Sequence, residues 1–111
     1  MEILRSYPEN MDRREEFKLT NSKEAQKLST AAGSVLELEK WIIYMDVDAK
    51  TGEMQKVLTI EAAGEVFATV SKTFIDSFEK AADFFNNNIG AIQVISGTSK
   101  AGREYIDCQI A

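Results

Sequence analysis

VFATVSKTFIDSFEKAADFF, residues 66–85, changes its hydrophobic period at Ser71. The part before Ser71 is rich in β-branched and aromatic residues, which is typical of a strand. After Ser71, Phe74, Phe78 and Phe85 recur at helical spacing, and Ala81 lies on the same stripe. An apolar stripe with this spacing predicts an amphipathic helix. The segment therefore predicts a strand that leads directly into a helix.

Strand patterns lie on both sides of this segment. Residues 35–47 and 54–62 are strand candidates before it, and a turn-like segment with Gly52 separates them. After the helix, residues 91–96 and 103–110 predict two more strands around the loop GTSKAG. The order of three strands, one helix and two strands is that of the OB-fold, a five-stranded Greek-key barrel. Other α+β folds share this order. The sequence predicts a mainly β, OB-fold-like barrel with the helix between strands three and four.

Residues 1–34 are the most polar part of the chain and contain its only proline, Pro8. We interpret them as an N-terminal extension with one or two short helices, one of them over residues 21–28. The barrel domain is expected over residues 35–111. The role of the extension is open, and it could mediate a homodimer or pack across the barrel.

The composition excludes several classes of site. With 111 residues, the chain has the size of one domain. It has one cysteine and no histidine, so an intrachain disulfide, Cys/His metal sites and His-based catalytic triads are excluded. The residues show no nucleophile–base pair, and DVDAKTGE lacks the spacing of an EF-hand. We expect no enzyme activity, no metal and no cofactor.

Location and charge give further expectations. No apolar run approaches the length of a membrane helix, and the first ten residues lack the pattern of a signal peptide, so we expect a cytoplasmic protein that does not bind membranes. The net charge of −5 counts against non-specific binding of duplex DNA. It leaves room for a local basic groove, since net charge does not fix the potential of one face.

The candidate contacts for a flat, charged ligand are aromatic rings and cations on the expected outer face of the barrel. Phe67 and Tyr105 alternate away from their apolar neighbours, while Trp41 and Tyr44 lie on opposite faces of the first strand. The other candidates are the basic residues Lys56, Lys100 and Arg103. The alternative is structural: Phe67 and Trp41 fill the core, the tyrosines are ordinary amphipathic surface residues, and Lys100 is a solvated charge in a hairpin.

Two C-terminal segments, LTIEAAGEVFATVSKTFIDSFEKAADF and IQVISGTSKAGREYIDCQI, resemble small single-stranded-DNA-binding proteins of protein-primed phages of Gram-positive bacteria. The shared features are a strand ending in AAG, an aromatic residue in the next strand, SKT at the helix start and GTS-x-x-G in the last hairpin. The resemblance covers about half of the chain. It implies base stacking by Phe67 and Tyr105 and a phosphate contact by Lys100.

Two functions follow as expectations. The first is a sequence-tolerant single-stranded-DNA-binding protein that acts in phage or mobile-element DNA replication or recombination inside a bacterial host. Its partners would be single-stranded DNA and replication or recombination proteins. The second is an acidic phage-type protein-interaction module or inhibitor built on the same small barrel, which the net charge of −5 favours slightly.

Overall fold

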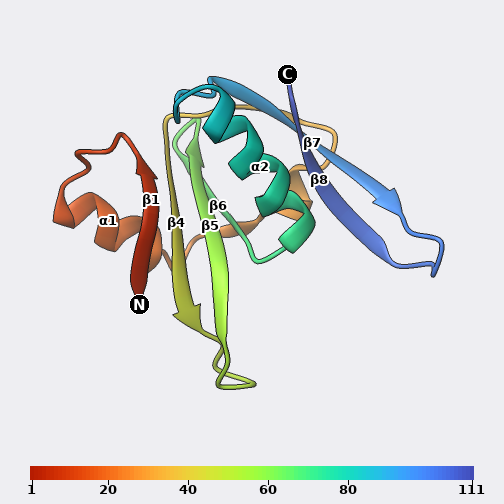
Figure 1. Cartoon of the computed structure of the whole chain (residues 1–111), viewed down its shortest axis with the longest axis horizontal. Helices are drawn as coiled ribbons and strands as arrows, with labels where there is room; N and C mark the ends of the chain where they lie inside the picture. Colours follow the sequence, from red (N-terminus) through yellow and green to blue (C-terminus); the bar gives the residue numbers. More distant parts are fainter.

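The computed structural model describes all residues from 1 to 111 and contains two sheets, two α-helices and one 3-10 helix (Figure 1). The elements in chain order are β1 (Glu2–Tyr7), α1 (Arg13–Thr20), β2 (Gln26–Lys27), η1 (Leu28–Ala31), β3 (Val35–Glu37), β4 (Lys40–Val47), β5 (Met54–Ala62), β6 (Glu65–Thr69), α2 (Lys72–Phe84), β7 (Ala91–Thr98) and β8 (Glu104–Ile110). The expected mainly β class is confirmed. No helix is long and apolar enough to span a membrane.

The strands form a five-stranded sheet with the order β1-β4-β5-β6-β2 and a three-stranded sheet with the order β3-β7-β8. The single strand expected over residues 35–47 is therefore two strands, and the chain passes from one sheet to the other between them. Backbone bonds hold this bend: the Leu38 N–H donates to Gly90 and the Glu39 N–H to Glu61. No ladder joins β6 to β8, so the strands do not close into one continuous barrel.

Helix α2 occupies the residues at which the phenylalanine spacing predicted a helix. The hydroxyl of Ser71 caps it by accepting a hydrogen bond from the Phe74 N–H at 3.3 Å. Phe74 and Phe78 are fully buried, and the Phe78 ring meets Trp41 edge to face at a centroid distance of 5.0 Å. The main core therefore lies between α2 and the two sheets. Phe85 is 38% exposed, because the helix ends one residue before it.

Residues 1–34 form part of the sheet as well as a helix. β1 pairs with β4 along the edge of the five-stranded sheet, and α1 contacts β4 and β5. A second apolar cluster forms between them: Met11, Leu19, Ile42, Tyr44 and Val57. The boundary after residue 34 stays a prediction.

The short helix expected over residues 21–28 is wrong. That segment contains β2 and the start of η1, and the helix of this region is α1 instead. Asp12 caps α1 by accepting a hydrogen bond from the Glu15 N–H at 2.8 Å. The cap at Asp12 and the burial of Leu19 stabilise a helix that begins at Arg13, and Asn21 is its C-cap.

Two hairpins extend from the body of the molecule. Figure 1 shows the β4–β5 hairpin and the β7–β8 hairpin pointing in different directions from the region of α2. The β7–β8 turn is tied by the Ser99 N–H, which donates to the Arg103 carbonyl at 2.8 Å, and by Gly102 in the left-handed region at φ 80°. No backbone ladder joins β6 to this hairpin, so a space separates the two sheets there.

Candidate nucleic-acid interface

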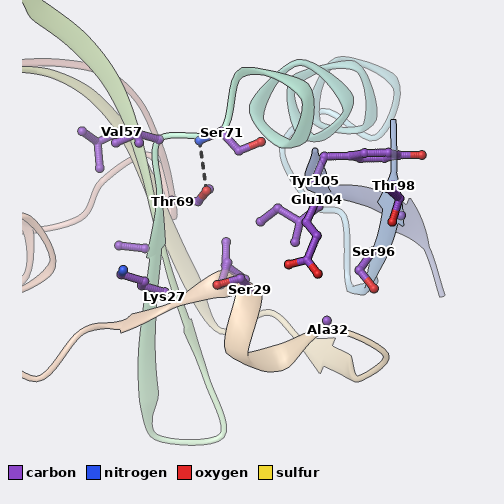
Figure 2. A pocket seen from close by; sticks show the side chains of 15 residues that line it. Lys27, Ser29, Ala32, Val57, Thr69, Ser71, Ser96, Thr98, Glu104 and Tyr105 are labelled. Atoms are coloured by element: carbon purple, nitrogen blue, oxygen red, sulfur yellow. Dashed lines mark hydrogen bonds between the residues drawn. The ribbon is translucent and has the colours of Figure 1, made fainter. Parts of the chain in front are cut away.

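A groove of about 1040 Å³ occupies the space between β6 and the β7–β8 hairpin, with the β2–η1 segment along a third side. Figure 2 shows its side chains, and the start of α2 lies beside it. The lining combines apolar and hydroxyl side chains with two charged ones: Lys27, Leu28, Ser29, Ala32, Val57, Ala68, Thr69, Val70, Ser71, Ser96, Gly97, Thr98, Glu104, Tyr105 and Ile106. A groove of this size is large enough to hold parts of a nucleotide strand.

Five serine and threonine side chains line the groove, and the hydrogen bonds of the structure involve only two of their hydroxyls. Thr69 accepts from the Ser71 N–H at 3.0 Å, and Ser71 caps α2. Ser29, Ser96 and Thr98 make no side-chain hydrogen bond within the protein. These three groups can donate to and accept from a bound ligand.

Some cations near the groove form an ion pair with a carboxylate, and others do not. Lys56 donates to Glu79 on α2 at 3.0 Å, so this predicted contact is in an ion pair instead of being free. Lys27 on β2 and the predicted contacts Lys100 and Arg103 in the hairpin form no ion pair. Near the groove, the cations without an ion pair therefore lie on one wall and at the tip of the hairpin.

Tyr105 is 44% exposed and stands beside Gly97 on the neighbouring strand. A Cβ built on Gly97 would lie 2.6 Å from the Tyr105 hydroxyl oxygen and 2.7 Å from Cζ, so the ring lies directly over the glycine. Figure 2 shows the ring extending along the hairpin beside Thr98, away from the centre of the groove. Its outer face is therefore available at the rim, and Lys100 and Arg103 precede it in the turn.

Three of the predicted aromatic contacts are buried, although Phe67 and at most one of Trp41 and Tyr44 were expected to face outward. Trp41 is fully buried, Phe67 is 5% exposed and Tyr44 is 6% exposed. Trp41 and Phe67 belong to the main core, so the structural alternative holds for both of them. A base can stack only on a ring with a free face, and these side chains offer none.

The error at Phe67 has a physical cause. Its neighbours Val66 and Ala68 are apolar, and this pattern predicts that they form the inward face. The outer face of this sheet is itself covered: Val66 packs against the second cluster, and Ala68 lines the groove. A sheet that is covered on both sides has no polar face, so alternation alone does not give its orientation.

Tyr44 lies under the N-terminal segment, in the second cluster with Met11 and Leu19. Burial raises the pKa of its phenol above the usual value of 10.0. Residues 1–34 therefore cover the outer face of β4 and β5, and a ligand cannot reach that face. The groove beside β6 is the surface that remains accessible.

Sequence reasoning missed the groove residues Lys27, Ser96, Thr98 and Glu104. A signal for Ser96 and Thr98 was present, because the inward positions of β7 change from Ile92 and Val94 to serine and threonine toward the hairpin. Core positions that become polar at one end of a strand indicate that the core ends there. Lys27 had no such signal, since β2 is only two residues long.

The family model described as Phage Single-stranded DNA-binding protein matches residues 1–111, the full length of the chain. No curated protein and no solved structure matches the chain significantly. A match over the whole chain shows the family, so the chain belongs to the Phage Single-stranded DNA-binding protein family.

Proposed function

We propose that the protein is a non-enzymatic, sequence-tolerant single-stranded-DNA-binding protein that acts in phage or mobile-element replication or recombination in the cytoplasm of a bacterial host. The observation that carries the proposal is the family match over residues 1–111, together with a groove edged by an exposed ring and free cations. Stacking on an aromatic ring tolerates every base, since every base has a π-face.

The fold supports this reading as an open form of the OB barrel. β3 and β4 together correspond to the first strand, β5 and β6 to the second and third, and β7 and β8 to the last two. OB-folds bind oligonucleotides across strands two and three and the neighbouring loops. Here α1 covers the outer face of β4 and β5, so the proposed path runs along β6 and the β7–β8 hairpin.

The proposed binding mode assigns different roles to different parts of the surface. Tyr105 stacks on a base at the rim, and a stacked base contributes about 1–3 kcal/mol. Lys27, Lys100 and Arg103 contact phosphates, so affinity falls as salt rises. The net charge of −5 weakens long-range attraction of DNA to the molecule as a whole, so the proposal relies on these local cations.

The test is fluorescence anisotropy with a labelled mixed-sequence single strand and with its duplex, each at low and moderate salt. The proposal expects micromolar or tighter binding to the single strand alone, and weaker binding at higher salt. Absence of binding to either at low salt and high protein concentration would overturn it. That outcome would favour the acidic protein-interaction module, which pull-downs from phage-infected cells would then examine.

The proposal extends to partners of two kinds. Replication or recombination proteins would act on the DNA that this protein coats, and a second copy of the chain would form a homodimer. Light scattering coupled to size exclusion, with and without a bound oligonucleotide, distinguishes a monomer from the homodimer.

A further inference from the structure

Glu104 places a negative charge inside the groove that we propose holds DNA. The carboxylate forms no ion pair and no side-chain hydrogen bond. It stands opposite Thr98 in the β7–β8 ladder, and Figure 2 shows it directed into the groove between Ser29 and Ser96. Tyr105 lies on the other face of the strand, as alternation requires. Glu104 is thus the one carboxylate among the lining residues.

A carboxylate at this position is unfavourable for a phosphate, since like charges repel and no cation pairs with Glu104. Lys27 is on the β2 side, and Lys100 and Arg103 are in the hairpin turn. The backbone of a bound strand is therefore expected to follow the cations, and the bases to point toward Glu104. The groups that meet the bases are one carboxylate and the free hydroxyls of Ser29, Ser96 and Thr98.

We propose that Glu104 reads the base edge and gives the groove a preference for cytosine over thymine. This inference rests on the proposed single-stranded-DNA function and adds a specificity to it. A carboxylate only accepts hydrogen bonds. Cytosine presents an N4 amino donor, which is the group that Glu and Asp recognise on this base, while thymine presents the O4 acceptor at the same place. The thymine O4 and the carboxylate are both acceptors, so no hydrogen bond can form between them.

The neighbouring hydroxyls do not produce this preference by themselves. Serine and threonine hydroxyls both donate and accept, so Ser29, Ser96 and Thr98 suit either pyrimidine. Glu104 is therefore the discriminating side chain. Glutamine in its place offers a donor as well as an acceptor and would remove the discrimination with little change in shape.

The experiment compares oligo-dC and oligo-dT of equal length with the full chain, by anisotropy at one salt concentration and at pH 8. We expect the native protein to bind oligo-dC about fivefold more tightly than oligo-dT, the low end of what one base contact provides. E104Q should bind both equally, through a gain on oligo-dT. The control is E2Q on β1, which removes the same charge from an exposed residue that forms no ion pair.

The ratio of the oligo-dC affinity to the oligo-dT affinity isolates the effect of Glu104, because the native protein and E104Q are measured with the same two oligonucleotides. An equal ratio in the native protein and E104Q, or an equal gain on both oligonucleotides, would overturn the base-reading role and leave single-strand binding intact. A mixed-sequence strand is measured in parallel. Its failure to bind the native protein would instead overturn the proposed function.

Discussion

Tyr105 lies so close over Gly97 that residue 97 has no room for a side chain. A Cβ at this position would be 2.6 Å from the Tyr105 hydroxyl oxygen and 3.0 Å from Cε1. The two residues face each other in the β7–β8 ladder. An aromatic ring that packs over a cross-strand glycine shields the exposed backbone and is held in one orientation. The glycine thus fixes the ring at the groove rim with one face toward solvent.

This relationship predicts that Gly97→Ala weakens single-strand binding. The new methyl group must displace the ring, because the clash is with ring atoms as well as the hydroxyl. We expect about a tenfold loss of affinity, comparable to one stacked base. Tyr105→Ala should lose as much, and Tyr105→Phe should bind normally. Anisotropy titrations measure all three variants.

A double-variant cycle provides the control for this prediction. If Gly97 acts only by holding the ring, adding Gly97→Ala to Tyr105→Ala causes no further loss. Additive losses would contradict the proposed link between the two residues. Phe84→Ala is a matched control, because Phe84 is an 81% exposed aromatic residue at the far end of α2.

The buried rings should affect stability and leave the contact surface unchanged. Trp41→Ala or Phe67→Ala removes a core side chain and is expected to lower the free energy of unfolding by about 3–5 kcal/mol. Urea denaturation measures this loss. Under conditions that keep a conservative variant such as Trp41→Phe folded, its single-strand affinity should equal that of the native protein. A selective loss of affinity in folded Trp41→Phe would restore Trp41 as a DNA contact.

The salt dependence of DNA affinity should distinguish the predicted cations that contact phosphates from those that do not. Neutralising Lys100 or Arg103 should reduce the slope of log affinity against log salt by about 0.7, the value for one phosphate contact on a single strand. Lys56→Gln should change the slope less, since Glu79 already binds this lysine at 3.0 Å. Lys18→Gln on α1 is the control, and equal slopes for Lys100→Gln and Lys18→Gln would contradict the hairpin contact.

Cys108 should be chemically inert in the folded protein. Burial, with a smaller contribution from Asp107, raises the pKa of its thiol from 9.0 to about 12. At pH 8 the thiolate is therefore about a thousandfold less populated than in the unfolded chain. A thiol reagent should react slowly with the native protein and rapidly in denaturant. Equal rates in both states would contradict the burial of the thiol.

The same shift predicts a direction for stability against pH. Below pH 9 the thiol is protonated in both states and contributes nothing to the pH dependence. Between pH 9 and about 12 the Cys108 thiol loses its proton in the unfolded chain but keeps it in the folded protein. The free energy of unfolding therefore falls progressively as pH rises. Comparison with Cys108→Ser by urea denaturation isolates this contribution, and parallel curves above pH 9 would contradict it.

The local patterns of the sequence were sufficient for several elements. The spacing of Phe74 and Phe78 predicted α2, and the turn residues around Gly52 predicted the hairpin between β4 and β5. These signals depend on residues that are close in sequence. The exposure of Tyr105 and the burial of Cys108 also follow from alternation in β8, where one face is in the core and the other meets solvent.

Local residue patterns predict the mainly β class, the amphipathic helix and the hairpin that carries Lys100, Arg103 and Tyr105, because hydrophobic period and turn chemistry are local properties. Tertiary packing set which face of β6 is inward, because Val66 packs against the second cluster and Ala68 lines the groove, so that both faces of the strand are apolar. It also brought Lys27 and Glu104 to one groove, although 76 positions separate them in the chain. Contacts between distant segments depend on how the two sheets pack, and no single stretch of residues contains that information.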